Sequence, residues 1–169
     1  MTCESAKLNL ARTVQGIRAT QQAAKFAGAA NERWFLEGVV CTQCQICHKI
    51  CYSTDSLCRE CLSDQLDWIL DSQPATLRSF TRLHVSSNDL FQAGAPWSVG
   101  LVEHCSGLSY FVFMAGSVTA IGVELRLFTA PDVTGQSVVI AAEVGADAKA
   151  LAQGFAAELS KLGTEESTK

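Results

Sequence analysis

The sequence predicts an α+β protein: a small cysteine-rich module precedes a β-barrel, and helices lie at both ends. Six of the eight cysteines fall between Cys41 and Cys61, which marks the module. Five short apolar runs follow it, separated by turn residues and with no helical pattern between them, as in a compact barrel. Apolar residues recur at helical spacing near both termini. At 169 residues, the chain suits one medium domain with a small appended module.

Residues 1–37 are expected to form an N-terminal helical segment. Leu10, Val14 and Ile17 fall at helical spacing. The stretch Trp-Phe-Leu-Glu-Gly at residues 34–38 is expected to end the last helix just before the cysteines. The segment therefore leads directly into the cysteine-rich module.

Residues 76–145 are expected to form a small β-barrel of the OB type. No helices alternate with the strands, so a parallel sheet is not favoured. Ser106-Gly107 marks a hairpin turn, and residues 131–135 (Pro-Asp-Val-Thr-Gly) mark another turn. The five expected strands are residues 77–85, 97–105, 108–114, 123–128 and 137–142.

Residues 146–169 are expected to form a C-terminal helix and a solvated tail. Leu151, Phe155, Leu159 and Leu162 fall on one face of such a helix. That apolar face can pack on the barrel or on another subunit, and the pattern does not choose between them.

Composition excludes several classes of protein. Hydrophobic residues make up 48% of the chain, so it can bury a core and is not a disordered tail. The formal net charge is −4, which disfavours a role that depends on gripping phosphate backbones. No apolar run approaches the roughly 18 residues of a membrane span, and no secretory signal is evident. We therefore expect a cytoplasmic protein with reduced thiols and no membrane partner.

Two Cys-x-x-Cys pairs stand in the expected module, residues 38–75. Cys44 and Cys47 form the first pair, Cys58 and Cys61 the second, with ten residues between the pairs. Each pair can present two thiolates from a tight turn, and a short hairpin can bring the turns together around a tetrahedral ion. The spacing predicts a rubredoxin-like, four-cysteine zinc ribbon that holds one structural Zn²⁺ per chain. Because four thiolates close the coordination shell, its role is expected to be folding.

Other ligand sets stay open at this point. Cys41, Cys44, Cys47 and Cys51 have the spacing of a ferredoxin run, which would bind an iron–sulfur cluster. No proline follows Cys51, no second run exists, and this reading leaves the second Cys-x-x-Cys pair without a task. Zinc is therefore favoured, although Cys41 or Cys51 could replace one of the four predicted ligands.

The order of these features resembles a known family. An aromatic stretch at 34–38, a Cys-x2-Cys-x10-Cys-x2-Cys ribbon and Asp67-Trp68 precede the β segment. This is similar to the zinc-ribbon plus OB-fold proteins long filed as a family of unknown function. The resemblance runs from about Asn31 to Ile140. Family members often carry a Phe-Pro-Pro-Arg-like stretch between the knuckles, and residues 50–55 depart from it, so contacts through that segment are not expected to carry over.

The resemblance implies a function and a partner. Members of the family associate with thiolases, thiolase-like acyltransferases or hydratases that act on CoA thioesters. This chain would then be a non-catalytic accessory subunit, similar to the small subunit of a two-component thiolase. It would bind a thiolase-like catalytic subunit in a hetero-oligomer, stabilise the complex and help form or cover the acyl-CoA site at the shared interface.

The residues themselves show no catalytic set, so we expect no turnover by the chain alone. Outside the module only Cys3 and Cys105 are available as thiols, and neighbours in a strand such as His104 and Cys105 point to opposite faces. A nucleic-acid-binding ribbon and barrel module is the alternative function, and the sparse basic residues argue against it. The candidate contacts to a partner or an acyl-CoA are Trp34, Phe35, Phe91 and Trp97.

Overall fold

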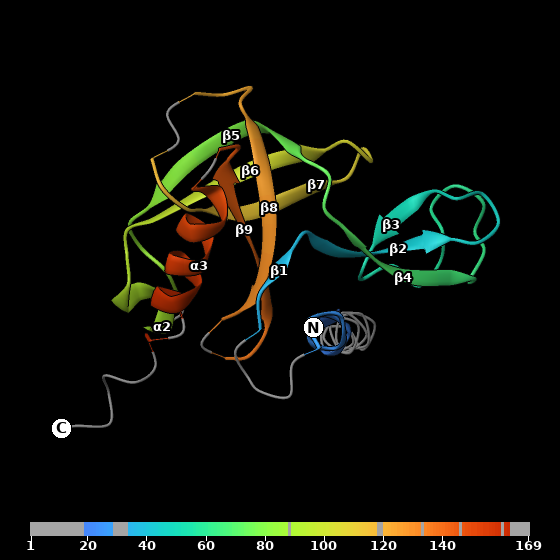
Figure 1. The fold of residues 1–169 in the computed structure, drawn as a ribbon, viewed down its shortest axis with the longest axis horizontal. Coiled ribbons are helices and arrows are strands. Elements are labelled where there is room, and N and C mark those ends of the chain that lie inside the picture. Colours follow the sequence, from blue (N-terminus) through green and yellow to red (C-terminus); the bar gives the residue numbers. More distant parts are fainter. Residues whose placement is uncertain are drawn as a thin grey trace, which may run out of the picture.

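Two β-sheets of different size form the frame of the molecule (Figure 1). The computed structural model describes residues 19–28, 34–87, 89–117, 120–132, 134–145, 147–159 and 161–162. Its strands and helices are β1 (Leu36–Glu37), β2 (Val39–Cys44), β3 (Ile50–Tyr52), β4 (Leu66–Asp71), β5 (Ala75–Leu83), α2 (Asp89–Ala93), β6 (Trp97–His104), β7 (Ser109–Met114), β8 (Glu124–Pro131), β9 (Ser137–Glu143) and α3 (Ala148–Leu159).

The larger sheet closes into a five-stranded barrel. Strands β5, β6 and β7 pair antiparallel in sequence order, β7 pairs with β9 in parallel, and β9 pairs antiparallel with β8. Strand β8 then returns to the start of β5. A register shift between Leu77 and Ser79 marks a bulge, which bends β5 so that it can pair on both sides. The predicted OB-type barrel is confirmed, and so is the α+β class of the chain.

Alternating side chains fill the barrel interior. Leu77, Val102, Val112 and Leu125 are almost fully buried there. Gly100 leaves room for this core, because a Cβ at that position would lie 2.8 Å from the sulfur of Met114. Along β6 and β7, buried residues tend to alternate with more exposed ones, as in a barrel with one filled side.

A second core lies between the barrel's outer surface and helix α3 (Figure 1). The helix packs chiefly on β9 and β8. Its buried residues are Ala148, Ala152 and Leu159, whereas Leu151 is 45% exposed. The helix was predicted, but the prediction of its buried face was partly wrong. Small alanine side chains face the sheet, because they let the helix axis approach it closely.

The chain enters the barrel earlier than predicted. A helix ending at residues 34–38 is wrong, because Leu36 and Glu37 form β1 and pair with Thr129 and Phe128 of β8. Tertiary pairing overrides the local helical pattern here. Residues 19–26 are helical, while Leu10, Val14 and Ile17 lie outside the described residues. Within the described part of the chain, no helix has the length and apolar character needed to cross a membrane.

The smaller sheet carries the cysteines and projects from one side of the barrel (Figure 1). Its strand order is β3-β2-β4, with β2 antiparallel to both neighbours. Gly38 separates β1 from β2 and has a φ of +129°, a conformation that L side chains rarely adopt. Its N–H donates to the carbonyl of Leu127 at 2.8 Å, and its carbonyl accepts from the hydroxyl of Thr129 at 2.6 Å. This glycine is where the chain passes from barrel to ribbon.

Candidate metal centre

Two turns of the same geometry present the four cysteines of the Cys-x-x-Cys pairs. Beyond the first pair, the N–H of His48 donates to the carbonyl of Cys44 at 3.0 Å, and His48 has a φ of 59°. Beyond the second pair, the N–H of Leu62 donates to the carbonyl of Cys58 at 2.9 Å, and Leu62 has a φ of 61°. Each pair is thus held in a tight turn that closes on a left-handed residue.

The sulfur atoms of these four cysteines converge on one point. The Sγ atoms of Cys44 and Cys61 are 3.5 Å apart, and those of Cys47 and Cys58 are 3.4 Å apart. All four sulfurs lie within 4.8 Å of one another. Four sulfurs about 2.3 Å from a central zinc ion lie about 3.8 Å apart at tetrahedral corners. The donor set therefore fits a tetrahedral, thiolate-ligated ion, and the four cysteines are positioned to bind a metal.

Backbone N–H groups favour the thiolate form of two of these sulfurs. The pKa of Cys44 is lowered, chiefly because the backbone N–H of Cys47 donates to its sulfur. The pKa of Cys58 falls to about 6, mainly through donation from the N–H groups of Cys61 and Glu60. Since metals bind thiolates, the turns prepare these two sulfurs for a cation, whereas neighbouring thiols help to raise the pKa of Cys47 and of Cys61 in the metal-free cluster.

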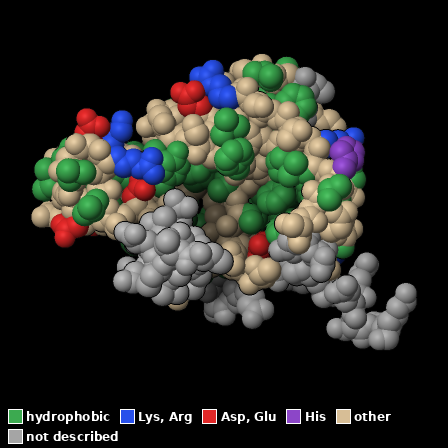
Figure 2. Space-filling model, turned by 180° about the vertical axis from the view of Figure 1, so that it is seen from behind, with side chains coloured by type: hydrophobic (Ala, Val, Ile, Leu, Met, Phe, Trp, Pro, Cys, Tyr) green, Lys and Arg blue, Asp and Glu red, His purple; other side chains and the backbone are tan. Residues whose placement is uncertain are grey.

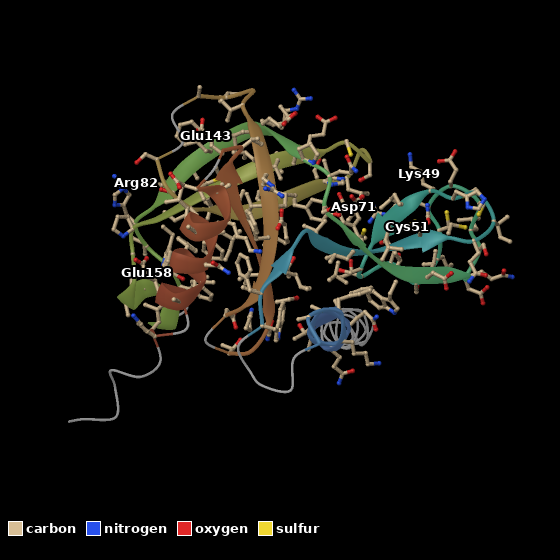
Figure 3. The ribbon with its side chains drawn as sticks, in the orientation of Figure 1. Lys49, Cys51, Asp71, Arg82, Glu143 and Glu158 are labelled. Carbon is tan, nitrogen blue, oxygen red and sulfur yellow. The ribbon has the colours of Figure 1, made fainter. Side chains whose placement is uncertain are left out.

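The other two cysteines of the module are not among the four converging sulfurs. Cys41 is buried in β2, where burial and then the charge of Asp71 raise its thiol pKa to about 12. Cys51 is buried in β3, and its sulfur lies 3.8 Å from the carbonyl of Lys49 (Figure 3). It packs with Cys44 and Cys58 in a small apolar cluster. The ferredoxin-like set is therefore not assembled around one point.

Trp34 and Phe35, two of the predicted contact residues, border a shallow hollow. Trp34 is buried in a cluster with Ala23 and Leu36. The ring of Phe35 stacks on Phe128 with centroids 5.3 Å apart. Together they line one wall of a hollow of about 170 Å³ whose other side is formed by the end of β8 and by α3. Their role toward a partner or an acyl-CoA stays a prediction.

Phe91 and Trp97, the other two, belong to an aromatic cluster beneath the helices. Their ring centroids lie 6.2 Å apart, and Trp97 also meets Phe113 at 5.7 Å and Phe155 at 5.8 Å. The indole N–H of Trp97 donates to the carbonyl of Phe91. This cluster fastens α2 and α3 to the barrel, so these side chains serve the chain's own core. A contact to another molecule stays a prediction for them as well.

Contacts that the sequence did not reveal join ribbon and barrel. The hydroxyl of Tyr52 on β3 donates to the carbonyl of Ser109 at 3.0 Å and accepts from the same residue's N–H at 2.9 Å. The rings of Tyr52 and Tyr110 meet edge-on with their centroids 5.6 Å apart, and the guanidinium carbon of Arg59 lies 4.6 Å from the centroid of the Tyr52 ring. In Figure 3, Asp71 lies at the end of β4, on the path back to the barrel. Tyr52 is therefore the residue that docks the ribbon on β7.

The expectation that His104 and Cys105 point to opposite faces of a strand is wrong, because β6 ends at His104 and Cys105 lies in the following turn, but the His104 ring is held by other groups. The His104 ring is buried, and its Nδ1 lies 2.8 Å from the Ser106 hydroxyl, while Nε2 lies 3.1 Å from the carbonyl of Gln73. Cys105 is exposed, and its sulfur is 3.9 Å from Nδ1. Both ring nitrogens have closer partners than the thiol, which indicates a structural histidine.

Comparisons with known proteins agree with the fold. No family model matches the sequence, and no curated protein matches it. Among solved structures, the chain is similar to one named Ltp2-ChsH2(DUF35) aldolase, with a TM-score of 0.56 and 16% sequence identity. The likeness covers 79% of this chain and 94% of that chain. At this identity the shared property is the fold, which is that of a zinc-ribbon-like cysteine module joined to an OB-type barrel.

Proposed function

We propose that this chain is a non-catalytic accessory subunit that holds one structural zinc ion and binds a thiolase-type enzyme. The observation that carries the proposal is the closed set of four thiols on a ribbon docked to an OB-type barrel. A site closed by four thiolates leaves no position for water or substrate, so the ion serves folding. Tetrahedral sulfur ligation suits zinc, and the ribbon is too small to have a large core of its own.

The metal assignment is tested by elemental analysis of the purified protein. We expect one zinc ion per chain, a colourless solution, and loss of the ion in Cys58→Ser. Cys41→Ala is the matched control, because Cys41 is buried in the same sheet but lies outside the group of four sulfurs. Loss of metal from Cys41→Ala with retention in Cys58→Ser would refute this ligand set. Visible absorption typical of an iron–sulfur cluster would refute zinc.

The accessory role is supported by fold and by chemistry. One solved chain with this fold is named Ltp2-ChsH2(DUF35) aldolase, so the fold occurs in an enzyme assembly. Within the described residues, His104 and Cys105 do not make a catalytic pair, and the four converging thiols are suited to metal rather than to acyl transfer. The resemblance of the sequence points the same way, toward enzymes of CoA thioesters.

The finer proposal concerns the partner. We infer a hetero-oligomer with a thiolase-like catalytic subunit in the cytoplasm, in which this chain stabilises the complex and helps form or cover the acyl-CoA site. A benzoylsuccinyl-CoA thiolase is one such two-component enzyme. Trp34 and Phe35 border a hollow that is mostly apolar in its lining, which supports them as candidates for the shared interface.

Co-expression with a thiolase-type catalytic subunit tests this role. We expect the chain alone to bind zinc and to show no thiolysis or condensation of CoA thioesters. We expect the two proteins to co-purify, and the catalytic subunit to lose activity or stability when this chain is left out. A catalytic subunit that is fully active and stable alone would overturn the proposal.

Nucleic-acid binding is the less favoured function. Phe111 on β7 is 84% exposed on the outer barrel surface, where an OB-type barrel can stack a base. Nearby, however, the guanidinium of Arg78 is paired with Glu103 at 2.7 Å. A shift of a labelled single-stranded oligonucleotide at low salt would favour this function over the accessory role.

A further inference from the structure

The outer end of the ribbon carries large apolar side chains beside its metal ligands. Ile46 lies between Cys44 and Cys47 and is 59% exposed, Leu57 precedes Cys58 and is 48% exposed, and Leu62 follows Cys61 and is 73% exposed. We call Ile46, Leu57 and Leu62 the ribbon tip. In Figure 1 the loops that join the ribbon strands lie at the end remote from the barrel, and Figure 2 shows apolar side chains on that end.

Leu62 is the most informative of the three. It has a φ of 61°, a left-handed conformation that bulky residues seldom adopt and that glycine or asparagine adopts at little cost. A leucine here strains the backbone and also exposes an apolar side chain. The left-handed backbone serves the second metal knuckle, where the N–H of Leu62 donates to the carbonyl of Cys58 at 2.9 Å. The side chain is a different matter, because an exposed leucine stands where asparagine or glycine would suit the turn better, which points to a contact made by the side chain.

The charges around the tip describe the surface that would cover it. Glu60 and Asp64 flank Leu62 in the sequence, both are exposed, and neither forms an ion pair with a described residue. Arg59, the nearest cation to Leu62 in the sequence, is already paired with Asp55 at 2.9 Å, whereas Lys49 is an exposed cation on the first knuckle, three residues from Ile46. A surface complementary to the Leu62 side of the tip is therefore an apolar depression with basic residues at its rim.

A second copy of the chain does not fit the tip. In a symmetric dimer through this end, the carboxylates of Glu60 and Asp64 would approach their own copies. Three side chains also cover far less than the roughly 800 Å² per partner that a stable interface buries. Insertion of the tip into a concave site on a larger protein meets neither objection, because the barrel can supply the rest of the contact area.

We propose that the ribbon tip inserts into an apolar, basic-rimmed depression on the catalytic subunit. This inference rests on the proposed function, since that subunit is the occupant it names. Docking at this end would also cover the two exposed metal ligands, Cys47 and Cys61. The tip is therefore both an anchor for the partner and a shield for the metal centre.

The test compares a tip variant with a matched surface variant in complex formation. Ile46→Gln combined with Leu62→Asn removes the apolar tip, and asparagine suits the backbone of residue 62. Val85→Gln is the control, because Val85 is also apolar and exposed but lies outside the ribbon. We expect the tip variant to keep its zinc and to bind the catalytic subunit about tenfold more weakly or worse. The control should bind like the wild type.

A second measurement is independent of the variants. Zinc transfer from the wild-type chain to a coloured chelator should slow when the catalytic subunit is bound, because Cys47 and Cys61 become covered. Unchanged transfer in the complex would overturn the inference, as would equal binding by the tip variant. A concentration-dependent dimer that the tip variant abolishes would assign the tip to a second copy instead.

The outcomes also separate this inference from the proposed function. If the wild type binds the catalytic subunit and the tip variant binds equally well, the accessory role stands and the tip assignment fails. If the wild type does not bind at all, both fail. Leu57→Gln, tested alone, guards against a folding defect in the double variant, and we expect it to weaken binding in the same direction.

Discussion

Gly38, the residue between barrel and ribbon, is a position where one added methyl group should be costly. In Gly38→Ala the new Cβ would lie 2.6 Å from the carbonyl oxygen of Asp71, a backbone atom that cannot turn aside. The backbone conformation itself costs an L residue about 1–3 kcal/mol. The close approach adds about 1–3 kcal/mol, as overpacking does elsewhere. We therefore expect a loss of about 2–6 kcal/mol in the free energy of unfolding.

The matched control is Gly107→Ala in the turn between β6 and β7. Gly107 has a φ of +83°, and a Cβ there would meet nothing within 4 Å. This variant should lose only the conformational cost of about 1–2 kcal/mol. Urea unfolding of the zinc-saturated proteins, followed by tryptophan fluorescence, measures both losses. Equal losses in the two variants would refute the reasoning, because the clash with Asp71 would then contribute nothing.

Three further predictions follow from other contacts. Tyr52→Phe removes both hydrogen bonds to Ser109 and should cost about 1–2 kcal/mol while leaving zinc content unchanged; amide exchange should rise at Ser109, and unchanged exchange would contradict the docking role. Ala152→Leu should destabilise by about 1–3 kcal/mol, since Ala152 is fully buried on the face of α3 that packs on the barrel, whereas Leu151→Gln should stay within about 0.5 kcal/mol by thermal unfolding. Iodoacetamide at neutral pH should label the exposed Cys105 and spare the buried Cys41, whose pKa of about 12 keeps the thiol protonated. Because the pKa of Cys41 is raised in the folded state, its contribution to stability is complete below pH 9 and is lost as the pH rises toward 12. Cys41→Ala should therefore make the free energy of unfolding less dependent on pH in the alkaline range.

Local patterns predicted much of the molecule because they depend on neighbours in the sequence. The spacing of Cys44, Cys47, Cys58 and Cys61 is a property of two short turns, and the structure brings their sulfurs together. The five apolar runs separated by turn residues correspond to strands β5 to β9.

Features that depend on residues far apart in the chain could not be predicted from the sequence. β1 is a strand because Leu36 meets Thr129, a residue more than ninety positions away. The contact between Tyr52 and Ser109 spans 57 positions. A local sequence pattern does not indicate which distant residue a side chain will contact. The positions of Cys41 and Cys51 relative to the other thiols likewise depend on how β2 pairs with its neighbours.

The pairing of β1 with β8 also sets an order of events during folding. The strand pairings within the ribbon, residues 39–71, join residues close in sequence, so the ribbon can form once its metal is bound. Strand β1 has no partner until β8 is available, and the barrel needs β9 before it can close through β7 and β8. Until the barrel closes, the ribbon is tethered to an unfinished domain at both of its ends. During synthesis, the ribbon would thus fold first, and its orientation would be fixed only when the slower barrel forms.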